Sequence, residues 1–178
     1  MYSIRLAEMR DAAAIAHVHV ESWLTTYRGL VPEGYLASLN AAERVPLWRE
    51  WLSSDFSVFV AEIEGKIVGF ASGGPIREAL GAYDAELYTI YLLEREQGRG
   101  IGKDLLSAVA KALVGKDYTS MLVWVLEQNP AVRFYEKAGA QHLMSKQTEI
   151  GGVSLNELAL GWPYLRRSIS SRNATGTD

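Results

Sequence analysis

A glycine-rich turn between a strand-like segment and a helix-like segment is the feature that most constrains this chain. Glycine occupies positions 98, 100 and 102, and the cations Arg99 and Lys103 stand beside it. Glycine lets the backbone approach a ligand without Cβ clashes, and the first N–H groups of the following helix are unpaired at the positive end of its dipole. The turn therefore predicts a binding site for a phosphate group.

Two common nucleotide motifs do not fit this turn. A Walker loop needs glycine five residues before Gly102 and Ser or Thr after Lys103, but Gln97 and Asp104 stand at those positions. A dinucleotide fingerprint that starts at Gly98 needs glycine or alanine at position 103, where this chain has Lys103. The fingerprint also belongs to an opening βαβ unit, whereas the segment before this turn has the pattern of a β-hairpin. Both motifs are excluded here.

The composition is that of an ordinary globular domain. Of the 178 residues, 48% are hydrophobic and 22% are charged, which excludes a disordered or fibrous chain. The formal charge of -3 argues against a general electrostatic grip on nucleic acid, and no apolar run reaches the ~18 residues of a membrane span. Because there is no cysteine, disulfides and cysteine nucleophiles are excluded. We expect a cytoplasmic protein that binds neither nucleic acid nor membrane.

Apolar periodicity predicts an α/β (α+β) fold, with one domain over residues 1–165 and a flexible C-terminal tail over 166–178, where apolar residues become rare. The expected strands lie at about 3–7, 57–63, 66–72, 86–93, 119–126, 141–149 and 153–160, and the expected helices at about 9–27, 41–52, 101–114 and 131–138.

Local signals support two of these elements. Asn40 with Glu43 three residues later reads as a capping box that opens a helix, and Glu64-Gly65 suits a tight hairpin between two strands. Trp48 and Trp51 are three residues apart on that helix, which puts them on one face. We expect both tryptophans in the core.

The glycine turn also resembles a hallmark of the GNAT acetyltransferase superfamily, which is Gln or Arg, two residues, Gly, one residue, then Gly or Ala. Gln97–Gly102 fits this hallmark, and Asn129–Gly139 is similar to the superfamily's second signature helix. The resemblance covers about residues 3–162. It implies a central mixed, mostly antiparallel seven-stranded sheet, splayed between its fourth and fifth strands, flanked by about four helices and holding acyl-CoA in the cleft.

The resemblance implies an enzyme that moves an acetyl group from acetyl-CoA directly to a primary amine of a small molecule. Acetyl-CoA is then a cosubstrate and no metal is expected. Three alternatives stay open: a peptide or protein acceptor, through its N-terminus or a lysine; a different acyl donor; and a catalytically silent domain that senses acyl-CoA. A homodimer is also compatible with the sequence.

The resemblance assigns the cofactor to three segments. The strand before the turn offers backbone groups to the pantetheine arm, with an N–H near Leu92 that polarises the thioester carbonyl. The turn holds the pyrophosphate, and Asn129 bonds the pantetheine arm while also serving as a helix N-cap. The expected cofactor-binding residues are Ile90, Tyr91, Leu92, Gln97, Gly98, Arg99, Gly100, Ile101, Gly102, Lys103 and Asn129.

Two residues are expected to move protons. An alkylamine with a pKa of about 10.4 must lose a proton before it attacks a thioester. Glu86 lies eleven residues before Gln97, where some superfamily members carry a general base that works through water, and its alternative role is an ordinary strand-end carboxylate. Tyr135 matches the tyrosine of the second signature helix, which returns a proton to the leaving thiolate.

The acceptor site is less defined by the sequence. In the superfamily, the loop after the first helix often covers the acceptor side. Here Glu21, Trp23, Tyr27 and Arg28 either line the acceptor pocket or form the amphipathic end of a helix.

Overall fold

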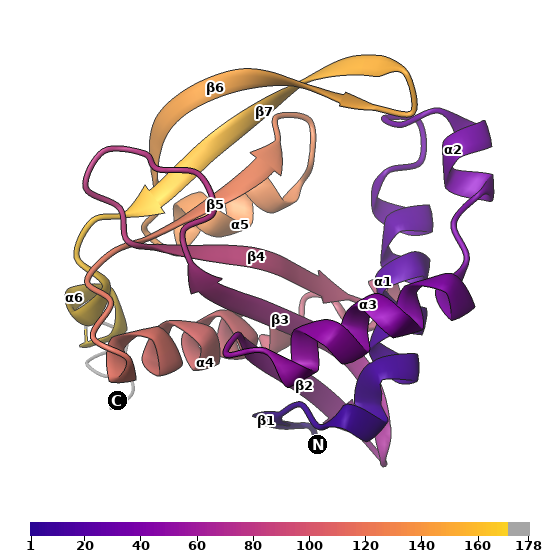
Figure 1. Ribbon diagram of the computed structural model, residues 1–178, viewed down its shortest axis with the longest axis horizontal. Helices are drawn as coiled ribbons and strands as arrows, with labels where there is room; N and C mark the ends of the chain where they lie inside the picture. Colours follow the sequence, from indigo (N-terminus) through magenta and orange to yellow (C-terminus); the bar gives the residue numbers. More distant parts are fainter. Residues whose placement is uncertain (171–178) are drawn as a thin grey trace.

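The computed structural model describes residues 1–170 as one seven-stranded sheet with helices on both faces (Figure 1). The elements are β1 (Ser3–Leu6), η1 (Met9–Asp11), α1 (Ala12–Thr26), α2 (Glu33–Ala37), α3 (Ala41–Ser53), β2 (Ser57–Ile63), β3 (Lys66–Pro75), β4 (Ala85–Leu92), η2 (Glu94–Glu96), α4 (Ile101–Gly115), β5 (Met121–Leu126), α5 (Ala131–Lys137), β6 (Gln141–Ile150), β7 (Val153–Trp162) and α6 (Leu165–Ser170).

The sheet has the order β1-β2-β3-β4-β5-β7-β6, and β4 with β5 is the parallel pair among the described strands. These two strands pair only from Ala85↔Met121 to Leu87↔Val123, although they continue to Leu92 and Leu126. Beyond Leu87 they separate. The predicted mixed sheet, splayed between its fourth and fifth strands, is confirmed.

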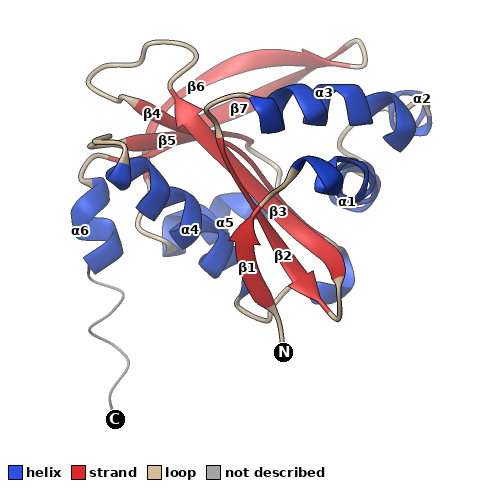
Figure 2. Cartoon of the chain, turned by 60° about the horizontal axis from the view of Figure 1, so that its bottom comes forward, coloured by secondary structure: helices blue, strands red, loops and turns tan. Residues whose placement is uncertain are grey.

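The helices divide between the two faces of the sheet. Figure 2 shows α1 and α3 on one side and α4 with α5 on the other. The stripe Leu105, Val109 and Leu113 of α4 is fully buried against the sheet, as its spacing predicted. On the opposite face Trp48 is buried and Trp51 packs half-buried beside it, so both tryptophans belong to the core as expected.

The predicted hairpin and helix cap are both present, with one correction. Glu64 and Gly65 have φ of 49° and 75°, which joins β2 to β3 in a tight turn of the kind that Gly favours. Asn40 caps α3 by accepting from the N–H of Ala42 at 2.9 Å. The expected capping box is not formed, because Glu43 accepts a hydrogen bond from the Asn40 side-chain amide at 3.4 Å instead of from the Asn40 backbone.

Three helical features differ from the sequence prediction. The predicted first helix is divided into η1 and α1, and the short α2 has too few residues to show a period. The tail was expected from residue 166, but α6 continues to Ser170. Leu165 anchors α6, since its side chain is buried beside α4 and its N–H bonds the Thr119 carbonyl at 2.9 Å. Residues 171–178 of the predicted tail lie outside the described residues. Within residues 1–170, no helix combines the length and apolar character that crossing a membrane requires.

Candidate active site

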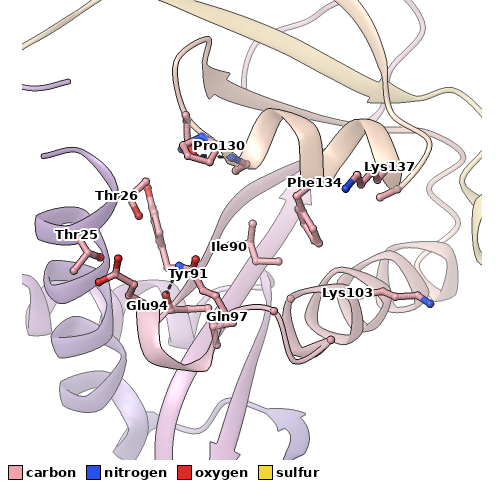
Figure 3. Close-up of a pocket in the computed structure, with 17 residues that line it drawn as sticks. Thr25, Thr26, Ile90, Tyr91, Glu94, Gln97, Lys103, Pro130, Phe134 and Lys137 are labelled. Atoms are coloured by element: carbon pink, nitrogen blue, oxygen red, sulfur yellow. Dashed lines mark hydrogen bonds between the residues drawn. The ribbon is translucent and has the colours of Figure 1, made fainter. Parts of the chain in front are cut away.

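A cavity of about 750 Å³ lies where β4 and β5 separate. Figure 3 shows its walls: the end of α1 with Thr25 and Thr26, β4 with Ile90 and Tyr91, the glycine turn with Gln97, and α5 with Phe134 and Lys137. A volume of this size is ordinary for a site that binds a cofactor-sized molecule.

The glycine turn presents a row of free backbone donors to this cavity. Gly98 and Gly100 have φ of 75° and 85°, a region that only glycine adopts readily, and Gly100 is the N-cap of α4. Among the described residues, no acceptor bonds the N–H groups of positions 98–103, and Asp104 is the first with one, the Gly100 carbonyl at 3.2 Å. Lys103 and Lys137 add positive charge to the lining. These groups fit a phosphate-bearing ligand.

The end of β4 points further backbone groups into the gap. Leu93 donates to the Val68 carbonyl at 2.9 Å, which makes Leu93 and Val68 a hydrogen-bonded pair. Because such pairs alternate in an antiparallel ladder, the next pair, Leu92 with Gly69, is not hydrogen-bonded. The N–H of Leu92 therefore points away from β3, toward the side that β5 has left. The Leu92 carbonyl accepts from the Gln97 side-chain amide at 3.3 Å.

Nine of the eleven expected cofactor residues line the cavity, namely Ile90, Tyr91, Leu92, Gln97, Gly98, Gly100, Gly102, Lys103 and Asn129. The other two do not. The Ile101 side chain is fully buried in the core, so only its backbone faces the turn. The Arg99 guanidinium forms an ion pair with Glu96 beside the turn.

Asn129 connects the cavity to a group of tyrosines. Its Oδ1 accepts from the N–H of Ala131 at 2.9 Å, so the cap bond expected from the sequence is present at the start of α5. Its Nδ2 donates to the Tyr27 hydroxyl at 3.2 Å, and that hydroxyl lies 3.4 Å from the Tyr91 hydroxyl. Burial raises the pKa of both tyrosines, which keeps the phenols neutral.

Tyr135 and Glu86 both lie outside the lining of the cavity. Tyr135 is 4% exposed on α5, with its ring against Phe134 and Trp162. Burial, and to a smaller extent Tyr27, raises its pKa. Glu86 is 2% exposed, and its carboxylate accepts hydrogen bonds from the guanidinium and the backbone N–H of Arg77.

Several lining residues were not predicted from the sequence. They come from α1, η2 and α5, and they are Thr25, Thr26, Glu94, Pro130, Ala131, Phe134, Lys137 and Ala138. Those around Asn129–Gly139 belong to the second signature segment, which could have suggested them. Of the four candidates for the acceptor side, Trp23 and Tyr27 pack beside Tyr91, while Glu21 and Arg28 are exposed.

His19 packs between the aromatic residues Trp48 and Tyr91. Trp48 donates to His19 Nδ1 at 3.2 Å, and the imidazole stacks on Tyr91 with ring centroids 5.3 Å apart. Burial, and to a smaller extent Arg44, lowers the pKa of His19 to about 4. His17 is exposed on the other side of α1. Within residues 1–170, no three His, Asp or Glu side chains gather as a metal site.

The fold and this site define an acetyltransferase. The acetyltransferase (GNAT) family profile matches residues 19–140, which is more than half of the chain. The chain belongs to this family, as the sequence resemblance predicted. It is an acetyl-CoA-dependent N-acetyltransferase, which confirms the expected enzyme class.

Characterised and uncharacterised relatives share much of the sequence. An uncharacterized N-acetyltransferase of Bacillus subtilis, YuaI, is 46% identical over 166 residues, which are 93% of this chain and 95% of the relative. The phosphinothricin N-acetyltransferase of Streptomyces viridochromogenes is 29% identical over 76% of this chain and 72% of its own. The L-amino acid N-acyltransferase MnaT of Escherichia coli is 30% identical over 59% of each chain.

The fold is also that of solved acetyltransferase structures. The structure of yncA, a putative acetyltransferase from Salmonella typhimurium with its cofactor acetyl-CoA, superposes with a TM-score of 0.73. The match covers 93% of this chain and 94% of that one at 23% identity. At this identity, the likeness establishes the shared fold.

Proposed function

We propose that this enzyme transfers the acetyl group of acetyl-CoA directly to the primary amine of a small molecule, and that amino acids are the acceptor class. The relatives whose names state an acceptor act on phosphinothricin and on L-amino acids, which supports a small acceptor.

The observation that carries this proposal is the closure of the acceptor side by the β6–β7 hairpin. In Figure 1 the hairpin reaches across to α2. Its turn packs so closely there that a Cβ on Gly151 would lie 2.8 Å from Cβ of Tyr35. Ile150 and Leu155 of the hairpin join the apolar cluster of Tyr27 and Leu36. An extended peptide needs an open face to lie across, whereas a small molecule does not.

The cofactor side provides three functions in this proposal. The free N–H groups of the glycine turn, with Lys103, hold the pyrophosphate of acetyl-CoA. The Leu92 N–H donates to the thioester carbonyl and stabilises the oxyanion that forms during attack. Asn129 holds the pantetheine arm, and Tyr135 returns a proton to the leaving thiolate. The Tyr135 hydroxyl carries a proton at neutral pH, because burial raises its pKa.

The proposal is tested by measuring free-thiol release from acetyl-CoA with a panel of acceptors: amino acids, polyamines, aminoglycosides and N-terminal or lysine-containing peptides. Amino acids should give the highest kcat/KM, with the acetylated amine identified by mass spectrometry. Turnover confined to peptides would contradict the small-acceptor proposal. Acetyl-CoA binding without thiol release for any amine would support an acyl-CoA sensor instead.

A further inference from the structure

Glu157 is a carboxylate without a partner on the acceptor side. It lies on β7 opposite Leu126 of β5 and Lys146 of β6. Side chains of directly paired strand residues share a face, so Glu157 lies with Leu126, which belongs to the cluster of Tyr27. Its side chain is half-buried, yet no described residue gives its carboxylate a hydrogen bond or an ion pair. A carboxylate in such surroundings ordinarily has a partner.

The charges around Glu157 compensate its negative charge only in part. Arg77 is paired with Glu86, and Lys146 is paired with Glu78 at 2.9 Å while its ammonium also lies 3.8 Å from the Trp124 ring centroid. Both neighbouring cations are thus engaged by other carboxylates. Glu157 is the remaining negative charge of the group, and an ammonium ion is the ligand that would balance it.

Glu157 is also connected to the cofactor cavity. Leu126, its partner across the strands, packs in the cluster of Tyr27, and the charge of Glu157 adds to the effect of burial in raising the pKa of Tyr27. The Tyr27 hydroxyl accepts from Asn129, and Asn129 lines the cavity. The Tyr27 cluster and the Tyr27–Asn129 hydrogen bond thus link the surroundings of Glu157 to the cavity lining.

Glu86 is less suited to receive a proton from the amine. Both of its oxygens accept from Arg77, and it is buried more completely than Glu157. Protonating Glu86 would break this ion pair and leave the guanidinium unpaired.

We propose that Glu157 binds the ammonium group of the acceptor and takes one proton from it. The neutral nitrogen then forms the C–N bond with the acetyl carbon, the C–S bond of acetyl-CoA breaks, and the electron pair leaves on sulfur. The sulfur takes up one proton, and the nitrogen releases its second proton to water to give the amide. The inference rests on the proposed function, because it names the group that receives the small amine. Glu157 thus acts on the acceptor, while the glycine turn acts on the donor.

Protonation of Glu157 should set the acidic limb of the pH profile of kcat/KM. Burial raises its pKa; Lys146 on β6 and Arg77 oppose this rise, while Glu86 and Glu78 add to it. Tyr27 faces it from the end of α1 and stays neutral. The carboxylate must be ionised to accept a proton, so activity should fall as pH falls through its pKa.

The test compares Glu157→Gln with Glu149→Gln, an exposed glutamate of the same hairpin. Glu157→Gln should lower kcat/KM for the best amine about 100-fold and remove the acidic limb, with the acetyl-CoA Kd unchanged. Glu149→Gln should match wild type. Lys146→Gln should move the acidic limb to higher pH, because Lys146 lowers the pKa of Glu157.

Each other outcome overturns the inference. Unchanged kcat/KM and pH profile in Glu157→Gln would remove Glu157 from the reaction, and loss of folding or acetyl-CoA binding would make its role structural. A wild-type enzyme that acetylates no small amine would contradict the proposed function itself, a result read from wild type alone and so distinct from failure of the Glu157 variant.

Discussion

The two sides of the splayed strands are built differently. The cofactor side uses backbone groups from two short segments, residues 90–103 and 129–138, whose conformation is determined locally by glycine, proline and a cap. The proposed acceptor side uses side chains that the fold brings together from distant parts of the chain, such as Tyr27, Glu86, Trp124 and Glu157. The acetyl-CoA site therefore follows from local sequence motifs, whereas the proposed amine site depends on how the whole chain folds.

Replacement of the buried Tyr135 on α5 should have the largest effect. Tyr135→Phe removes the proposed proton donor to the thiolate, so kcat should fall about 1,000-fold. The acetyl-CoA Kd should stay unchanged, because the donor is held by backbone groups. Steady-state kinetics and calorimetric titration measure the two quantities.

The control for this variant is Tyr164→Phe, at an exposed position beside α6. It should retain wild-type kcat. If Tyr135→Phe keeps wild-type kcat, Tyr135 is a packing residue against Trp162 and does not donate the proton to the thiolate.

The same contrast explains how far the sequence predicts this molecule. Strands, the α4 stripe and the glycine turn follow from apolar period and glycine spacing, which act within about ten residues. The glycine turn also predicts where most of the cavity lies. Its N–H donors are backbone groups of one short segment, so they do not depend on side chains from distant parts of the chain. The Arg99 side chain is an exception, because it forms an ion pair with Glu96 and does not line the cavity.

The acceptor side could not be predicted in this way. Arg77 and Glu86 meet because β3 and β4 are joined by an irregular loop. Glu157 lies opposite Leu126 of the Tyr27 cluster because β7 inserts between β5 and β6. Neither arrangement is indicated by an apolar period or by a local motif in the sequence. The short α2 and α6 were missed for a similar reason, as each is held by packing against another element.

A pH experiment distinguishes the scaffolds of the two sides. His19 is held neutral with its pKa lowered to about 4, while in the unfolded chain it titrates near 6.5. Its contribution is complete above pH 6.5 and is lost as pH falls toward 4, because the unfolded state gains the proton first. The difference of about 2.5 units corresponds to about 3 kcal/mol of unfolding free energy.

Urea denaturation at a series of pH values measures this loss. The decline between pH 6.5 and 4 should be reduced in His19→Gln and retained in His17→Gln, which changes an exposed histidine of the same helix. An equal decline in both variants would show that the acid sensitivity of the fold comes from groups other than the acceptor-side aromatics.

Removing one positive charge from the cofactor side should have a smaller effect, which appears in the acetyl-CoA Kd. Lys103→Gln removes one cation beside the free N–H groups, and the acetyl-CoA Kd should rise about tenfold, an effect that high salt reduces. Lys111→Gln, further along α4, should leave the Kd unchanged. Acetyl-pantetheine lacks the pyrophosphate, so its KM should be the same in wild type and Lys103→Gln. A raised KM for acetyl-pantetheine would place Lys103 at the pantetheine arm instead.

The smallest expected effect separates the conformation of the turn from its function. Gly100 and Gly65 both have positive φ, 85° and 75°, and an alanine at either position costs about 1 kcal/mol of stability by the same backbone strain. Denaturation should therefore show similar losses for Gly100→Ala and Gly65→Ala. Only Gly100 belongs to the row of N–H groups. Gly100→Ala keeps its own N–H but strains the turn that aligns the row, so only this variant should weaken acetyl-CoA binding. If both variants bind acetyl-CoA like wild type, the positive φ at residue 100 is not needed to align the donors.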